Sequence, residues 1–283
     1  MLAPTQETPL IANAATLLSA AAEAGHGDGE FHAPTLGEFF PAAIFFEGTP
    51  FELNRIMLVR LLAIAVMVLL FWLALRKGRL VPTRGQSIAE LGLDFVRVQI
   101  VDEILGEKLG RKYLPLLAAF FFGIFAMNIT GIIPGLNIAG TSVVAMPLLL
   151  ALVAYVAFIY AGFREVGHGR FFKNALFPAG VPWYMYVLLT PIEFINIFIV
   201  RPISLALRLL LNMMVGHLLL VLCFAATHFF FFTLGGATGA FGALTLVGGF
   251  VMTIVEMAVA LLQAYVFTLL ASVYIQQAAA EEH

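Results

Sequence analysis

Charged residues are scarce in this sequence, and cysteine is nearly absent. Asp, Glu, Lys and Arg together make up 11% of the 283 residues, whereas about a quarter is usual for a soluble domain. The lone cysteine, Cys223, excludes a disulfide framework within the chain and a site built from several thiolates. Because hydrophobic residues reach 61%, we interpret the chain as an integral membrane protein whose surroundings are a lipid bilayer.

The first 54 residues contain neither lysine nor arginine, although they carry seven acidic residues. A cleaved secretion signal begins with a basic stretch, so we expect this segment to be retained. Glycine and proline are scattered through GHGDGEFHAPTLGEFFPAAIFFEGTP, which indicates irregular structure. We therefore divide the chain into an acidic segment, 1–54, and a membrane domain, 55–283.

The membrane domain contains three apolar runs of ordinary spanning length, 56–75, 116–136 and 143–163. About 20 residues cross roughly 30 Å of hydrocarbon as a helix. Two further runs, 183–230 and 238–275, would reach roughly 70 Å and 55 Å as unbroken helices. These two runs must therefore break or lie at a steep tilt.

Two glycines lie between the two long runs, and only the first run contains proline. Gly235 and Gly236 predict a turn, so that the runs form an antiparallel hairpin. Pro191 and Pro202 allow a break or a bend in the first run, whereas the second run contains no proline and is predicted to be one long slanted helix. A reclining hairpin implies a large partner whose surface it follows. The predicted fold class is an all-α integral membrane protein with about five transmembrane helices, the last two forming the tilted hairpin.

Basic residues gather in two segments, with eight in 76–115 and three in 164–173, which is eleven of the fifteen in the chain. Because Lys and Arg favour the cytoplasmic side, both segments are predicted to be cytoplasmic, with the N-terminus outside and the C-terminus cytoplasmic. Within 84–110, apolar residues at helical spacing lie opposite acidic residues and Arg97, which predicts an amphipathic helix at the cytoplasmic interface. These apolar residues are Ile88, Leu91, Phe95, Val98 and Ile104.

Four polar side chains stand inside the long apolar runs: Arg208, His217, Glu256 and Gln263. A charge at membrane depth costs about 2.5 to 3.5 kcal/mol on insertion scales, so such residues often mark ion pathways. Each also has a structural interpretation, since an arginine can extend to the headgroups, a buried carboxyl can stay protonated, and histidine or glutamine can hold helices together.

The spacing of these residues favours a shared site. The midpoint between positions 208 and 263 falls between Gly235 and Gly236, and that between 217 and 256 lies one residue further on. A turn at the glycines would therefore place Arg208 level with Gln263, and His217 level with Glu256. Nine residues turn His217 to the face opposite Arg208, so we expect Arg208 to face a partner and His217 a wet pocket. Asn212 shares the face of Arg208.

The segments RPISLALRLLLNMMVGHLLL and EMAVALLQAYVFTLLASVYI closely resemble subunit a of the F-type ATP synthase. The family pattern S-x-x-L-R-L-x-x-N-M-x-x-G-[HE] is present as SLALRLLLNMMVGH, LQAYVFTLL is similar to its last helix, and NITGIIPG resembles a signature of its third helix. The likeness covers about residues 40 to 280.

The resemblance implies a proton-translocating stator in a bacterial inner membrane, with a ring of c subunits and b-type peripheral stalk subunits as partners. Arg208 would be the essential arginine that meets the ring carboxylate, and Gln263 the glutamine opposite it. His217 and Glu256 occupy positions where some members exchange the acid and the histidine, and would line an outer half-channel. Glu193 would serve the inner half-channel, although an acid at the interface explains it equally well.

Two other functions remain open at this point. A secondary transporter would use Arg208 as an anion site and Glu256 as a proton carrier, but it would show internal repeats, which the sequence lacks. An intramembrane metalloenzyme would need a third ligand beside His217 and Glu256, and the other histidines have no ligand spacing. Motifs for nucleotide binding, metalloproteases and serine hydrolases are absent. We therefore expect no catalytic site, cofactor, metal, nucleotide or nucleic acid on this chain.

Overall fold

The structure is a computed structural model, and it describes residues 43–45, 53–76, 83–133, 140–177, 183–234 and 236–279. The chain divides into two compact units, one formed by 35–220 with 250–283, and the other by 1–34 with 221–249. Each unit is considered by itself below.

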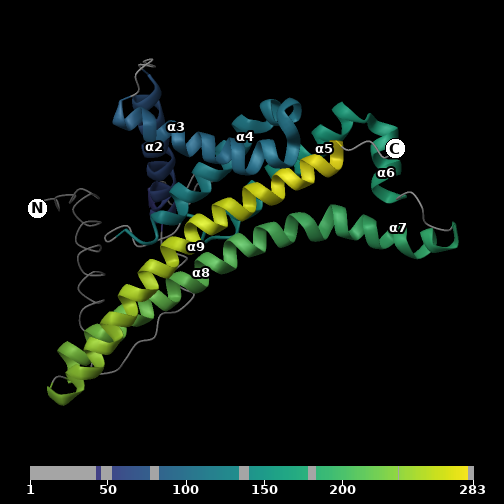
Figure 1. The fold of residues 1–283 in the computed structure, drawn as a ribbon. Coiled ribbons are helices and arrows are strands. Elements are labelled where there is room, and N and C mark those ends of the chain that lie inside the picture. The colour runs from purple at the N-terminus through teal and green to yellow at the C-terminus, as the bar shows by residue number, and fades with distance from the viewer. Residues whose placement is uncertain are drawn as a thin grey trace, which may run out of the picture. The chain divides into compact units, whose positions relative to one another are not determined.

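Helices account for nearly all of the described residues (Figure 1). The α-helices are α2 (Arg55–Leu75), α3 (Arg84–Val96), α4 (Glu103–Ile129), α5 (Ala145–Glu165), α6 (His168–Leu176), α7 (Tyr186–Ile195), α8 (Arg201–His228) and α9 (Gly239–Ala279). Short 3₁₀ or π segments adjoin them: η2 (Arg97–Asp102), η3 (Trp183–Met185), η4 (Asn196–Val200), η5 (Phe229–Leu234) and η6 (Gly236–Thr238). Within the described residues, five continuous helical stretches are long and apolar enough to cross a membrane. The predicted all-α membrane fold is thus confirmed.

A small β-ladder precedes the first helix. Strand β1 (Ala43–Phe45) pairs antiparallel with β2 (Leu53–Asn54). The glycine- and proline-rich stretch 25–50 was predicted to be irregular, and that prediction was wrong for Ala43–Phe45. The remainder of that segment lies outside the described residues.

The core of the larger unit is built where α4, α5, α8 and α9 pack together. Helix α5 presents small side chains to this core at helical spacing, namely Ala151, Ala154, Ala157 and Ala161. Small residues let helix backbones approach closely, which is how helices associate when lipid removes the hydrophobic advantage of packing. On α9, Phe267 and Ile275 are fully buried in the same core.

The basic segment before α4 is helical but bent. Helix α3 continues through the π-helical segment η2 into α4, where Gly106 adopts φ 72° and ψ 169°. Glycine tolerates this conformation because it has no Cβ, and the helix kinks there. Ile88, Leu91 and Phe95 are exposed, while Val96 and Ile100 are buried. The apolar stripe expected to face the membrane is therefore on the surface of this chain.

Helix α4 ends at Ile129 rather than at 136, where the apolar run ends. The chain turns through Thr130 to Ile133 and is described again from Gly140, whose amide donates to the Met127 carbonyl at 2.9 Å. This turn explains the early end of the helix.

The smaller unit contains the end of α8 and the beginning of α9. The Thr227 and Thr245 hydroxyls lie 3.0 Å apart, and Phe224 packs so closely on Gly249 that an added Cβ would stand 3.2 Å from its ring. Gly236, at φ 65°, lies in the turn between the helices. The two segments are therefore antiparallel, with Gly236 in the turn as predicted, while Gly235 lies outside the described residues.

Candidate functional site

Arg208 is exposed on the surface of α8. Exposed leucines flank it, with Leu207 46% and Leu211 52% exposed, while the exposed polar residues Ser204 and Asn212 lie one turn before and one turn after it. Within the described part of the chain, no side chain forms a hydrogen bond or ion pair with the Arg208 guanidinium. A permanent cation thus stands on a hydrophobic surface without an internal partner.

The surface around Arg208 is apolar on both long helices. Exposed apolar residues recur at helical spacing along α8 and, within the same unit, along α9. They are Ile203, Leu207, Leu211, Val215 and Leu219 on α8, and Phe250, Val251, Ile254, Val255, Met257, Leu261 and Leu262 on α9. Exposed apolar residues at this density are suited to lipid or to another membrane protein.

Arg201, two turns earlier on α8, has internal partners. Its Nη1 donates to Oε1 of Gln277 at 2.9 Å, and its guanidinium carbon lies 5.2 Å from the centre of the Tyr274 ring. Both partners belong to α9, so this arginine joins the two helices. The two arginines on α8 therefore differ in kind: one is held within the chain and the other is not.

Gln263 is bonded to Asn212 and not to Arg208. Asn212 Nδ2 donates to Gln263 Oε1 at 2.9 Å, and Gln263 is only 2% exposed. Gln263 therefore receives its hydrogen bond from the residue one helical turn after Arg208. Asn212 lies on the face of Arg208, four residues away, and its bond fixes that face relative to α9.

Glu256 and His217 are both buried, at 3% and 4% exposure. The Glu256 carboxyl lies against α8, since a Cβ added at Gly216 would stand 3.1 Å from its Oε1. Neither carboxyl oxygen of Glu256 has a hydrogen-bond partner among the described residues. An acid at the level of Gly216 and His217 is the arrangement that the spacing predicted for this end of the site.

Glu193 lies apart from these groups. It is half-buried near the end of α7, and the π-helical segment η4 separates it from Arg201. No described contact joins it to Arg208, His217 or Glu256.

The sequence analysis missed a polar cluster between α2 and the turn after α4. Arg60 Nε donates to the Gly140 carbonyl, and Thr141 Oγ1 donates to Asn128 Oδ1. Asn128 and Thr141 are almost fully buried. The Asn, Thr and Ser residues scattered between 128 and 142 could have indicated this polar cluster.

These features define a multi-pass helical membrane protein with a buried acid and an exposed arginine in its last two long helices, the arginine having no polar partner in the described part of the chain. Comparison with known proteins gives a narrower answer, because residues 57–276 match the ATP synthase A chain family. The chain belongs to the ATP synthase subunit a family and is therefore a component of the membrane part of that complex.

Individual relatives agree with this family. ATP synthase subunit a of Rhodococcus erythropolis is 47% identical over 255 residues, which is 90% of this chain and 93% of the relative. The subunit from Streptomyces lividans is 40% identical over 230 residues, 81% of each chain, and that from Frankia alni is 37% identical over 233 residues, 82% of this chain and 79% of the relative.

Proposed function

We propose that this chain is the proton-translocating stator of its ATP synthase, and that Arg208 meets the carboxylate of each c subunit as the ring turns past. The observation that carries the proposal is the placement of Arg208, which is exposed, flanked by exposed leucines and without a partner among the described residues. A cation in that position is stabilised by a partner that supplies an anion.

The chemistry of the pair gives the arginine its role. A carboxylate is costly in hydrocarbon, and a guanidinium, which is always protonated, offers it a counter-charge and two parallel hydrogen bonds. A ring carboxyl that approaches Arg208 is therefore favoured to release its proton. The same fixed positive charge repels protons, so it separates two half-channels and prevents direct leakage.

The buried groups supply the outer half-channel in this proposal. Glu256 and His217 carry groups that can bind and release a proton, and both are buried. The Asn212–Gln263 bond holds the arginine face against α9. Glu193, beyond η4, is the candidate for the inner half-channel.

The proposal includes the topology and the partners. The acidic N-terminal segment lies outside and the C-terminus in the cytoplasm of a bacterial cell, as the distribution of lysine and arginine favours. The c-ring lies against the apolar face of α8 and α9, and b-type stalk subunits hold the chain still. This chain has no catalytic site of its own, and its contribution to synthesis is the energy of protons, about 2.3 kcal/mol for each charge crossing 100 mV.

Replacing Arg208 by alanine tests the proposal, and Arg201→Ala is the matched control on the same helix. Both variants are assembled into the complete ATP synthase in membrane vesicles, and ATP synthesis driven by a proton gradient is measured. We expect Arg208→Ala to reduce synthesis to background. Arg201→Ala removes an exposed contact of small energetic value and should stay within about twofold of wild type.

Assembly is checked by the amount of soluble ATPase bound to the vesicles, so that loss of the complex is distinguished from loss of coupling. Synthesis at the wild-type rate in an assembled Arg208→Ala complex would show that the arginine has no part in translocation.

A further inference from the structure

Arg60 is a charged residue within a spanning helix, and its contact is with the backbone of another segment. It lies on the inner side of α2, close to the buried Ile56 and Val59, and is itself half-buried. Among the described residues no acid pairs with Arg60, and its Nη2 atom is buried without a hydrogen-bond partner. Its Nε donates to the Gly140 carbonyl. Because a charge in a spanning helix is costly, this contact marks a specific role.

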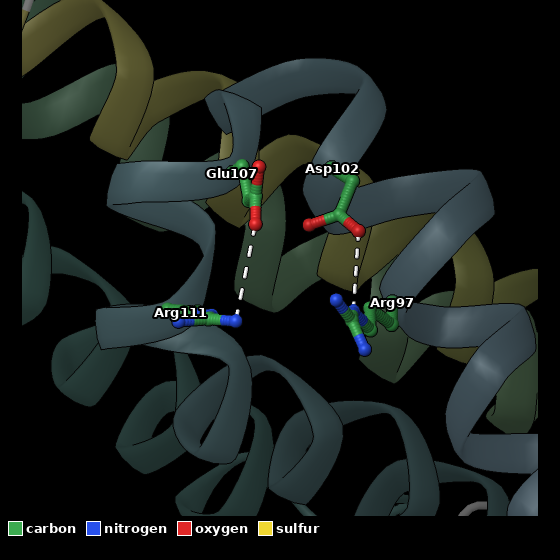
Figure 2. Close-up of polar contacts among 4 residues, drawn as sticks. All are labelled: Arg97, Asp102, Glu107 and Arg111. Carbon is green, nitrogen blue, oxygen red and sulfur yellow. Dashed lines mark hydrogen bonds and ion pairs between the residues drawn. The ribbon is translucent and has the colours of Figure 1, made fainter.

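Two arginines of the basic segment 76–115 have the opposite arrangement. Figure 2 shows Arg97 paired with Asp102 at 3.2 Å and Arg111 with Glu107 at 3.9 Å. The exposed fraction of these four side chains runs from 31% to 76%, and exposed pairs of this kind contribute little to stability. Arg111 therefore supplies a control for Arg60, because its loss removes only a weak surface contact.

Gly140, which accepts the hydrogen bond from Arg60, is enclosed between α2 and the end of α4. Its amide donates to the Met127 carbonyl at 2.9 Å, so both of its backbone polar groups are used. A Cβ added at Gly140 would stand 3.0 Å from Met127 Cβ and 3.1 Å from Arg60 Cγ. A larger residue would therefore displace one of these neighbours. The position at which the chain returns to α4 is fixed from two sides.

The turn after α4, which leads to Gly140, reaches the last two long helices. Ile132 in this turn packs against the buried pair Met213 of α8 and Ala260 of α9. On α9, Ala260 lies between Glu256 and Gln263. The turn therefore meets α8 and α9 between the level of the buried acid and that of the buried glutamine.

We propose that Arg60 is a positioning residue for proton translocation, which holds the turn after α4 against α8 and α9 through the Gly140 carbonyl. The apolar turn closes the space between Glu256 and Gln263, so that water that reaches the acid does not continue towards Arg208. The inference rests on the proposed function, since it needs Glu256 in the outer half-channel. Because the charge of Arg60 has no acidic partner among the described residues, the hydrogen bond to the carbonyl is the part that acts.

Two replacements of Arg60 separate the hydrogen bond from the charge. Glutamine places a donor nitrogen the same number of bonds from Cα as arginine Nε, whereas methionine has a comparable length and no donor. Arg60→Met should therefore release Gly140, and Arg60→Gln should hold it. Gly140→Ala, which is too large for its place, should act as Arg60→Met does. Its control is Gly123→Ala, where an added Cβ meets nothing within 4 Å.

Cysteine labelling measures the position of the turn independently of activity. In the complete ATP synthase with Cys223→Ser, Ala260→Cys places a thiol under Ile132, and Ala271→Cys places one in the main core, about three turns further along α9. N-ethylmaleimide reacts with thiolates, which form in water and not in apolar surroundings. We expect Arg60→Met to raise the labelling rate of Ala260→Cys roughly fivefold, the effect of one lost hydrogen bond on a local opening. Labelling of Ala271→Cys should not change.

ATP synthesis in vesicles completes the test. It should fall severalfold with Arg60→Met and with Gly140→Ala, and stay within about twofold of wild type with Arg60→Gln, Gly123→Ala and Arg111→Met.

Unchanged labelling of Ala260→Cys in Arg60→Met would overturn the inference, and so would normal synthesis despite increased labelling. Equal loss of synthesis in Arg60→Gln would show that the charge acts instead, and increased labelling at both cysteines would show general loosening of the fold. Because labelling does not depend on proton movement, failure of this inference is distinguishable from failure of the proposed function, which Arg208→Ala tests.

Discussion

Gly216 determines how closely the Glu256 carboxyl can approach α8. A Cβ at this position would stand 3.1 Å from Oε1 and 3.3 Å from the carboxyl carbon of Glu256. Contacts this short require the neighbour to move by a few tenths of an ångström. The glycine therefore leaves room for the Glu256 carboxyl directly against α8.

We expect Gly216→Ala to slow proton movement severalfold, because the added methyl displaces the carboxyl of Glu256. Helix propensity alone would favour alanine by about 1 kcal/mol, so a decrease in rate cannot come from a weaker helix. Passive proton flux through vesicles stripped of the soluble ATPase measures the effect. Gly248→Ala, where an added Cβ meets nothing within 4 Å, is the control and should keep the wild-type flux. Equal flux in both variants would show that the position of Glu256 does not matter.

The sequence predicted the depth of these polar residues in the hairpin better than it predicted their contacts. In an antiparallel hairpin, the position of the turn decides which residue numbers lie at the same depth. With the turn at the glycines, Glu256 is at the level of His217. The partner of Gln263 depends on which way each side chain leaves its helix. Arg208 points outward and Asn212 reaches α9, a choice that the packing of the neighbouring helix decides and that spacing alone leaves open.

At the scale of helices, Pro202 does not break the first long run, because the helix takes π-helical winding just before it. Pro202 follows the π-helical segment η4, in which the Arg201 amide donates to the Asn196 carbonyl, five residues back. A proline has no N–H and its ring crowds the carbonyl four residues before it, and a wider turn relieves both problems. The first long run therefore continues as one helical stretch, 186–234, rather than breaking.

We expect Pro202→Ala to lower ATP synthesis severalfold while the complex remains assembled. Alanine supplies the missing donor, so η4 can return to α-helical winding. Loss of the extra residue in that turn rotates α7 by about 100° relative to α8, which turns Glu193 away from its present side. Synthesis in vesicles is measured against Pro191→Ala, whose proline lies in the ordinary α-helical part of α7. Unchanged synthesis in Pro202→Ala would show that the π-helical segment η4 is not required for function.

The absence of proline from the second long run predicted its course more reliably than the presence of proline predicted that of the first. Helix α9 runs unbroken from Gly239 to Ala279, as its sequence predicted. The kink at Gly106 was not predicted, because a glycine within a helical pattern is as often tolerated as it is used for a bend. The end of α4 at Ile129 did have a signal, since Gly131 and Pro134 lie within the apolar run to 136 and are typical of the residues that follow a helix.

For the whole molecule, the distribution of charge predicts the orientation in the membrane. Eight lysines and arginines lie in 76–115 and three in 164–173, while the first 54 residues carry seven acids and no basic residue. Only one assignment places both basic segments in the cytoplasm, and it places the N-terminus outside.

Labelling of single cysteines tests this orientation. Cys223→Ser gives a background without cysteine, since the chain has only one. A maleimide that does not cross membranes should then label Ser19→Cys only in right-side-out vesicles, and Lys108→Cys and Arg170→Cys only in inverted vesicles. Lys108 and Arg170 are both exposed, so failure to react in one vesicle type reflects the membrane and not burial. The opposite pattern would place the basic segments outside and would exchange the two half-channels, because Glu256 and His217 would then open towards the cytoplasm.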